Sequence, residues 1–146
     1  MKHARLAIIS GAILFLALPV LAQMTPVGLW RNIDDKTGQA KAEIRIKTDS
    51  QGVLSGVIEK ALVTSSEPLC VACTDDRQGK PKLGLEVIRG AKKAEGKDVW
   101  EDGKILDPDN GRNYSLRLTP VDGGAKLEVR GSFGPFGRTQ TWVRIQ

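Results

Sequence analysis

The sequence predicts an all-β protein, an antiparallel up-and-down β-barrel of about eight strands that follows a cleaved signal peptide. Three observations support this fold class: short stretches alternate apolar and polar residues, turn-forming residues separate them, and no helical apolar stripe follows residue 23. Alternation with a period of two is typical of a strand with one buried face. Because closing a meander into a barrel removes its exposed edges, we favour a barrel over a two-sheet sandwich.

The first 22 residues predict an export signal. A basic start with Lys2 and Arg5 precedes an apolar run over residues 6–18, and Val20 and Ala22 provide compact residues for a cleavage site. The run is shorter than the roughly 20 residues of a spanning helix, although an uncleaved anchor is the alternative. No cysteine follows Ala22, which excludes the lipid-anchored type of signal.

We therefore expect a bacterial periplasmic or secreted protein with one domain, residues 23–146, and no membrane span after cleavage. Cleavage also removes His3, the only histidine. This excludes Ser-His-Asp chemistry, histidine-ligated zinc and c-type haem, for which Thr74 stands in the histidine position. Loss of Lys2 and Arg5 lowers the formal net charge from +5 to +3, and the scattered basic residues do not favour nucleic-acid binding.

The alternation locates each strand in turn. In residues 41–48, for example, Ile44 and Ile46 alternate with Lys41, Arg45 and Lys47, so that the charged residues are expected to face outward. The long connection between the third and fourth strands, near 64–82, contains both cysteines. The predicted strands are 28–33, 41–48, 53–63, 83–89, 98–106, 113–120, 125–133 and 139–145.

Acidic residues gather between residues 101 and 111, namely Glu101, Asp102, Asp107 and Asp109. Carboxylate catalysis needs two acids that face each other across a substrate, which adjacency in sequence does not provide. A calcium loop that starts at Asp107 fails because Gly111 takes the fifth position, where an oxygen ligand is needed. We interpret residues 107–111 as a hairpin turn in which Gly111 supplies a positive φ, and we predict no catalytic residue, metal or cofactor.

Cys70 and Cys73 are the only cysteines, spaced C-x-x-C. Three interpretations are open: a local disulfide, a redox-active pair and half of a metal site. An oxidising compartment favours the disulfide. A redox pair would begin a helix in a βαβ unit, and a closed zinc site would need further ligands.

Gly28 and Trp30 begin the first strand, and Arg144 ends the last. In a closed meander these strands are neighbours, so the Arg144 guanidinium can cover the Trp30 indole. The pattern resembles the lipocalins and the wider calycin superfamily, in which G-x-W on the first strand meets a late arginine. The lipocalin T-D-Y motif is absent, and Arg144 would face outward if Val143 and Ile145 faced the core.

A second resemblance covers nearly all of residues 23–146. The order G-L-W, C-V-A-C, P-K-L-G-L, W-E-D-G-K-I-L-D-P-D-N-G-R-N-Y and G-R-T-Q-T-W-V-R is similar to a bacterial exported family known as domain of unknown function 2147. The resemblance implies a lipocalin-like barrel. It implies no reaction and no established ligand.

The leading functional hypothesis is a non-enzymatic protein that binds a small, partly apolar molecule inside the barrel. An eight-stranded barrel is just wide enough for one small ligand. The second hypothesis is an envelope protein-interaction module with a filled barrel, an unidentified partner and contacts at 70–73 and 133–136; a carboxylate enzyme is third. Strand parity predicts as lining residues Trp30, Ile44, Leu85, Trp100, Tyr114 and Leu116.

Overall fold

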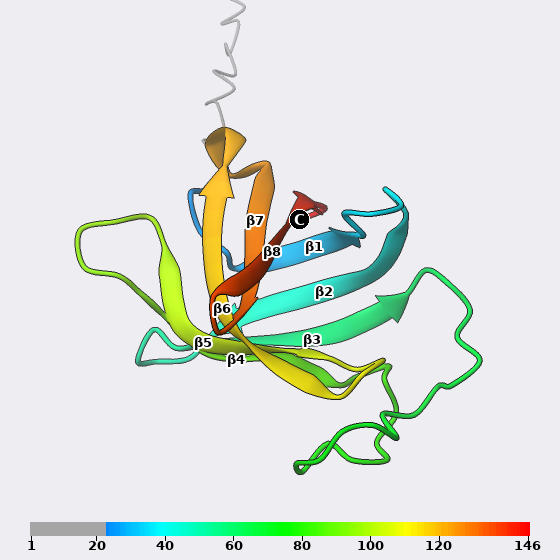
Figure 1. Cartoon of the computed structure of the whole chain (residues 1–146). Helices are drawn as coiled ribbons and strands as arrows, with labels where there is room; N and C mark the ends of the chain where they lie inside the picture. The colour runs from blue at the N-terminus through cyan, green and yellow to red at the C-terminus, as the bar shows by residue number, and fades with distance from the viewer. Residues whose placement is uncertain (1–22) are drawn as a thin grey trace, which may run out of the picture.

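The computed structural model describes residues 23–146, and the predicted signal peptide lies outside this range. These residues form eight strands and one short 3₁₀ helix (Figure 1). Each strand pairs antiparallel with the next, and the last pairs with the first, which closes the barrel. The elements are β1 (Gly28–Ile33), β2 (Ala40–Thr48), β3 (Leu54–Ala61), β4 (Glu86–Lys93), β5 (Trp100–Asp107), β6 (Arg112–Val121), η1 (Asp122–Gly124), β7 (Lys126–Phe133) and β8 (Phe136–Arg144).

The predicted fold class and the eight predicted strands are confirmed. The largest shift concerns β4, which begins at Glu86 and ends at Lys93, three and four residues later than expected. Gly84 has a φ of +84°, and its backbone N–H donates to the carbonyl of Ile58. Residues 83–85 therefore belong to the connection that leads into β4.

The antiparallel order places the connections alternately at the two ends of the barrel. The β1–β2, β3–β4, β5–β6 and β7–β8 connections lie at one end, called here the open end. The opposite, closed end holds the other three connections and both ends of the described chain. The β3–β4 connection is the longest and extends well beyond its strands (Figure 1).

A cation–π pair plugs the closed end. The Arg144 guanidinium lies 4.1 Å from the centroid of the Trp30 ring, and the Trp30 indole donates to the carbonyl of Pro26 at 2.7 Å. Any side chain at Gly28 would meet the Arg144 guanidinium at 2.5 Å, which explains the glycine of the G-x-W motif. Trp30 and Arg144 therefore face each other at the closed end.

Arg144 also binds the backbone around it. It donates to the carbonyls of Gly124 at 2.6 Å, Val27 at 2.9 Å and Thr25 at 2.6 Å. Burial lowers the pKa of its guanidinium. Val143 and Ile145 are exposed. Because they do not face the core, strand parity allows Arg144 to face inward.

The β3–β4 connection, residues 62–85, is cross-linked by a disulfide between Cys70 and Cys73, with both residues buried. The predicted local disulfide is confirmed. Around it the chain folds back on itself, because the Cys70 N–H donates to Lys80 O and the Lys82 N–H to Pro68 O, each at 2.8 Å.

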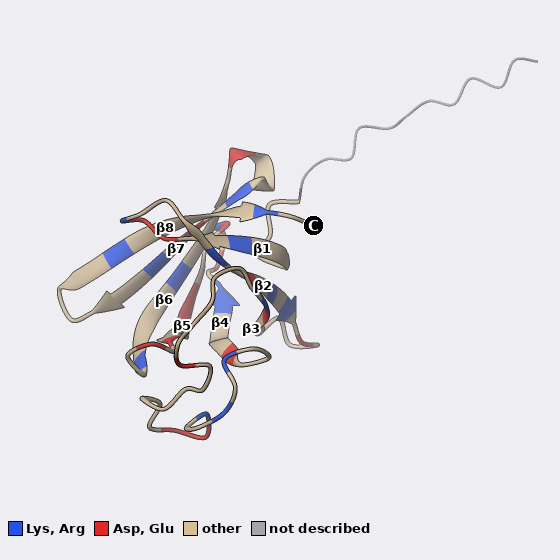
Figure 2. Ribbon diagram, turned by 90° about the vertical axis from the view of Figure 1, so that its right-hand side faces the viewer, with Lys and Arg blue, Asp and Glu red and all other residues tan. Residues whose placement is uncertain are grey.

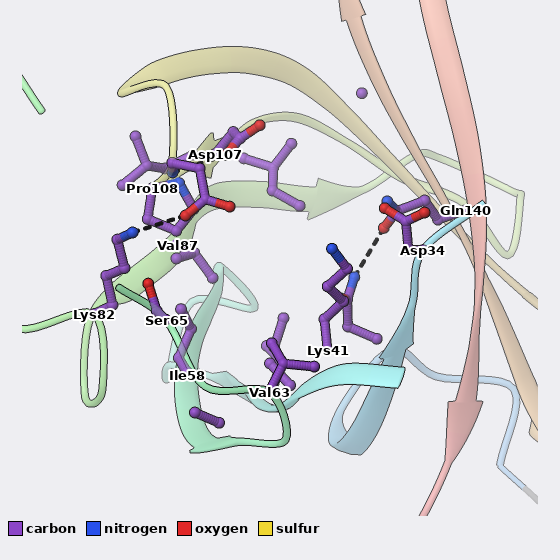
Figure 3. Close-up of a pocket in the computed structure, with 18 of the residues that line it drawn as sticks. Asp34, Lys41, Ile58, Val63, Ser65, Lys82, Val87, Asp107, Pro108 and Gln140 are labelled. Atoms are coloured by element: carbon purple, nitrogen blue, oxygen red, sulfur yellow. Dashed lines mark hydrogen bonds and ion pairs between the residues drawn. The ribbon is translucent and has the colours of Figure 1, made fainter. Parts of the chain in front are cut away.

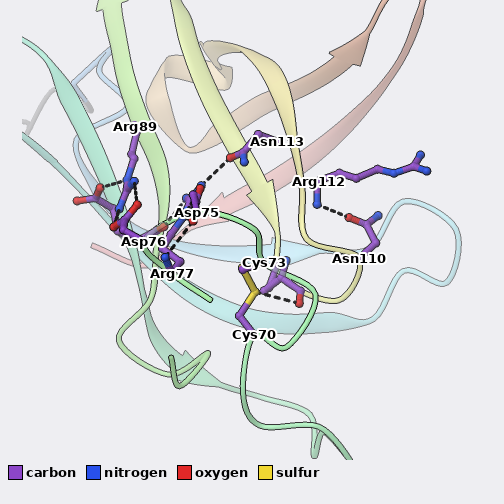
Figure 4. Close-up of polar contacts among 11 residues, drawn as sticks. Cys70, Cys73, Asp75, Asp76, Arg77, Arg89, Asn110, Arg112 and Asn113 are labelled. Atoms are coloured by element: carbon purple, nitrogen blue, oxygen red, sulfur yellow. Dashed lines mark hydrogen bonds and ion pairs between the residues drawn. A yellow bond between two sulfur atoms is a disulfide. The ribbon is translucent and has the colours of Figure 1, made fainter. Parts of the chain in front are cut away.

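Arg77 fastens this connection to the barrel (Figure 4). Its guanidinium is almost fully buried and donates to the Asp75 carboxylate at 2.5 Å, the Glu86 carbonyl at 2.8 Å and the Asn113 side chain at 2.7 Å. Glu86 and Asn113 lie in β4 and β6. One buried cation thus joins the connection to two strands at the open end.

Charge is dispersed over the described surface. Figure 2 shows lysine and arginine residues on several strands and loops in that view, without one concentrated basic face. Across residues 23–146 there is no helix with the length and apolar character that crossing a bilayer requires.

Candidate ligand-binding cavity

A cavity of about 1020 Å³ lies inside the open end of the barrel. Ligand pockets in proteins usually measure about 300–1,000 Å³, so this space is ample for a small molecule. Its inner wall is apolar and includes Ile44, Ile58, Val87, Ile105 and Val129. These side chains come from five strands, and four of the five are buried.

One side of the cavity is polar, where β8 meets β1. The Gln140 side-chain oxygen accepts hydrogen bonds from Asn32 Nδ2 at 2.8 Å and from the indole N–H of Trp142 at 2.9 Å. Gln140 Nε2 lies 3.5 Å from the Asp35 carboxylate. The barrel therefore offers amide groups beside its apolar wall.

Charged residues surround the mouth of the cavity. Lys82 forms an ion pair with Asp109 at 2.7 Å, and Arg138 forms one with Asp35. The hydrogen bond from Arg138 lowers the pKa of the Asp35 carboxyl. Hydrogen bonds from the Thr37 backbone and hydroxyl lower the pKa of Asp34, so both aspartates are ionised at neutral pH.

Lys41 also lines the cavity and is half-buried. It lies on the same side as Asp34 and Gln140 (Figure 3). The alternation in residues 41–48 predicted that Lys41 would face outward, which is wrong. Irregularities at Asn32/Ile33 in the β1–β2 pairing and at Glu43/Ile44 in the β2–β3 pairing interrupt the alternation there.

Large apolar side chains form the rim of the mouth. Phe133 and Phe136, from the β7–β8 turn, are 68% and 76% exposed. Leu69, Val71 and Leu83, from the β3–β4 connection, are exposed too, and all five line the cavity. This apolar rim consists of two segments that lie far apart in the sequence.

The β5–β6 turn supports the connection that contributes to this rim. Gly111 has a φ of +72°, as predicted, and a Cβ atom there would lie 1.9 Å from the carbonyl oxygen of Ala72. The Cys70 sulfur lies 3.5 Å from the carbonyl of Pro108. Residues 70–73 therefore pack directly on this turn.

The six predicted lining residues divide into two groups. Ile44 and Tyr114 line the cavity, and the Tyr114 hydroxyl lies 3.2 Å from Asn110 Nδ2. The other four are buried in the core and do not line this cavity; they are Trp30, Leu85, Trp100 and Leu116. Parity identifies a face of a strand, but it does not reveal how far along the barrel a residue lies.

Asn32, Lys41 and Gln140 were not among the predicted lining residues. A signal for Gln140 existed, because it lies two residues before Trp142 and so shares its face of the strand. Lys41 gave no comparable signal, since its environment depends on irregular strand pairing.

The four carboxylates considered for catalysis do not form a single site. Glu101 pairs with Arg117 at 3.1 Å, near the start of β5. Asp107 and Asp109 lie at the other end of β5, where Asp107 accepts the backbone N–H of Asp109 and Asp109 pairs with Lys82. Within residues 23–146 no three His, Cys, Asp or Glu side chains are grouped as a metal site would require.

A closed eight-stranded antiparallel barrel, plugged at one end by Trp30 and Arg144 and open at the other over a cavity, defines a lipocalin-like protein. The chain belongs to the family described as "Uncharacterized protein conserved in bacteria (DUF2147)", whose model matches residues 28–144.

A solved structure has the same fold. It is protein HP1028 from Helicobacter pylori, which is described as belonging to the lipocalin family. The chain described here is similar to it with a TM-score of 0.69 and 16% sequence identity over 82% of each chain. No curated protein matches the sequence. These comparisons establish the family and the fold.

Proposed function

We propose that this is an exported, non-enzymatic protein that binds a small, partly apolar molecule in the open-end cavity. The observation that carries the proposal is the cavity itself, about 1020 Å³ in volume, with an apolar wall and a few polar groups on one side. This combination is typical of small-molecule sites. The signal-like segment of residues 1–22 and the disulfide support a periplasmic or secreted location.

The proposal can be tested by blocking the cavity. A Cβ atom at Gly131 would lie 3.4 Å from Tyr114 Cβ and 3.6 Å from Ile105 Cγ2, which are ordinary contacts. The Cβ atom of Gly131→Leu is therefore accommodated, and we expect the rest of the leucine side chain to enter the cavity that Gly131 lines. Thr141→Leu, at an exposed position of β8, is the matched control.

The measurement is the fluorescence of N-phenyl-1-naphthylamine, a neutral apolar probe, titrated with protein. We expect the unaltered protein and Thr141→Leu to bind the probe, and Gly131→Leu to bind it about tenfold more weakly, or about 1.4 kcal/mol. Equal binding by both variants would show that the probe lies elsewhere. Native mass spectrometry of the protein from its own periplasm then identifies the natural ligand.

A second candidate function is interaction with an envelope protein through the apolar rim. The exposure of Phe133 and Phe136 is the observation that favours it, because exposed aromatic side chains at a pocket mouth often mark contact sites. The replacement of both by serine should abolish crosslinking to a defined partner in the parent cell. If crosslinking persists, the rim is not the contact surface.

A further inference from the structure

We propose that the cavity takes acidic amphiphiles, molecules with one carboxylate on an apolar chain or ring, and that Lys41 recognises the carboxylate. This inference rests on the proposed function of the cavity. Its starting observation concerns charge: of the charged side chains that line the cavity within residues 23–146, Lys41 alone forms no ion pair or hydrogen bond. The partnered ones are Asp34, Glu67, Lys82, Asp107, Asp109 and Arg138.

The charge of Lys41 contributes to lowering the pKa of Asp34. The two residues nevertheless form no ion pair. Asp34 Oδ1 instead accepts the backbone N–H of Thr37 at 2.8 Å, its hydroxyl at 3.0 Å and the N–H of Lys36 at 3.1 Å. Asp34 therefore holds its own turn, and the Lys41 ammonium stays available.

Lys41 is half-buried as a residue, and within the described chain its ammonium has no partner in the cavity that it lines. A carboxylate that enters the cavity would supply a charge-assisted hydrogen bond, which is stronger than a bond between neutral groups. The Gln140 amide nitrogen lies on the same side, and its 3.5 Å contact with Asp35 is long. A closer acceptor on a ligand could replace that contact.

The other residues that line the cavity determine which chemical groups the rest of the ligand can have. Beyond Lys41 the wall is made of Ile44, Ile58, Ile105 and Val129, which suit an apolar chain or ring. One ammonium balances one negative charge. A doubly charged phosphate would leave excess negative charge near Asp34, and a cationic ligand would be repelled by Lys41. A monocarboxylate is therefore the class that fits.

The test compares decanoic acid with decanol, which differ at the head group alone, as competitors of N-phenyl-1-naphthylamine at pH 7.5. The variants are Lys41→Met, Lys41→Arg and the control Lys92→Met, an exposed strand lysine that does not line the cavity. We expect decanoic acid to bind the unaltered protein about tenfold more tightly than decanol, a difference of about 1.4 kcal/mol. Lys41→Met should abolish the preference, whereas Lys41→Arg and Lys92→Met should keep it.

The outcomes separate the two proposals. If decanol binds as tightly as decanoic acid, or if Lys41→Met keeps the preference for the acid, recognition by Lys41 is wrong while the cavity remains a binding site. If the probe, the acid and the alcohol all fail to bind, both proposals are wrong. The comparison of acid with alcohol on the unaltered protein requires no variant to fold, and circular dichroism checks the folding of each variant.

Discussion

The Arg144 side chain contacts several parts of the barrel at its closed end. Its guanidinium covers the Trp30 indole at 4.1 Å and donates to carbonyls in η1 and in the segment before β1. A cation–π contact is worth about 0.5–2 kcal/mol, and hydrogen bonds from a charged group add to this. Arg144 therefore binds three parts of the chain at the closed end.

We predict that Trp30→Ala destabilises the protein by about 3–5 kcal/mol, because it removes a fully buried aromatic side chain. Arg144→Ala should cost about 2–4 kcal/mol, since buried carbonyls lose their donors in addition to the ring contact. The double variant should cost less than the sum of the two, because the shared contact can be lost once. Urea unfolding monitored by circular dichroism measures each value.

Arg130→Ala is the matched control, because Arg130 is exposed on β7 and its side chain forms one long hydrogen bond, at 3.4 Å, with Thr139. It should change the free energy of unfolding by less than about 0.5 kcal/mol. Strict additivity of Trp30→Ala and Arg144→Ala would contradict an energetic role for the stacked pair.

The β3–β4 connection, residues 62–85, lies outside the regular strand pairing of the barrel. Local hydrogen bonds, a disulfide and the buried Arg77 maintain it instead. Arg89 extends the polar contacts by pairing with Asp76 at 2.8 Å and with Glu86 (Figure 4). The connection is thus cross-linked internally and fastened to β4 and β6.

We predict that the disulfide contributes modestly to stability. A four-residue loop gains about 2 kcal/mol from the cross-link in the chain-entropy model, and Arg77 fastens the connection independently. Replacement of Cys70 and Cys73 by alanine should therefore leave a folded β protein with a lower urea midpoint. Complete loss of the β-sheet signal in circular dichroism would show that the disulfide is essential.

The ion pair of Asp75 with Arg77, in the same connection, should make the stability of the protein sensitive to acid. Hydrogen bonds from the Arg77 side chain and backbone hold the pKa of the Asp75 carboxyl well below its ordinary value. Because the folded pKa is depressed, the stabilisation is present above the unfolded pKa, about 4, and is lost as the pH falls below it. The Asp75 side chain is 34% exposed, so solvent screening limits the effect to about 1 kcal/mol.

The measurement compares the unaltered protein with Asp75→Asn by urea unfolding at pH 7 and pH 3. The unaltered protein should be the more stable at pH 7, and the difference should narrow at pH 3. Asp102→Asn is the control, because Asp102 is exposed and forms no ion pair within the described chain. A difference that is the same at both pH values would contradict the role of the Asp75 charge.

At the scale of the whole molecule, the barrel is a cup with a plugged base and an open mouth. The plug lies at the closed end, with both termini of the described chain. The cavity lies at the open end, with the β1–β2, β3–β4, β5–β6 and β7–β8 connections. Entry of the proposed ligand and the proposed partner contact at the apolar rim would therefore use the same end.

We predict that the protein is exported and begins at Gln23, because Val20 and Ala22 are the compact residues expected at a cleavage site after an apolar run. Intact-mass measurement of the protein from the periplasm or culture medium should match residues 23–146. Recovery of the protein with Met1 in the membrane fraction would contradict cleavage.

The sequence by itself predicted the eight strands, their antiparallel order and the approach of Trp30 to Arg144, although strand parity left open which way Arg144 faces. Alternation is a local property of each strand, and closure of the meander then requires the first and last strands to meet. The local disulfide followed from the proximity of Cys70 and Cys73 and from the predicted compartment. None of these conclusions required knowing how far along the barrel a given residue lies.

The tertiary structure alone decided which inward-facing residues line the cavity. Leu116 and Tyr114 share a face of β6, yet Tyr114 lies at the cavity and Leu116 in the core. Lys41 reaches the cavity because irregular pairing with β1 and β3 interrupts the alternation of β2. Depth and irregular pairing depend on contacts between strands that are distant in sequence, and a pattern read along one strand does not contain them.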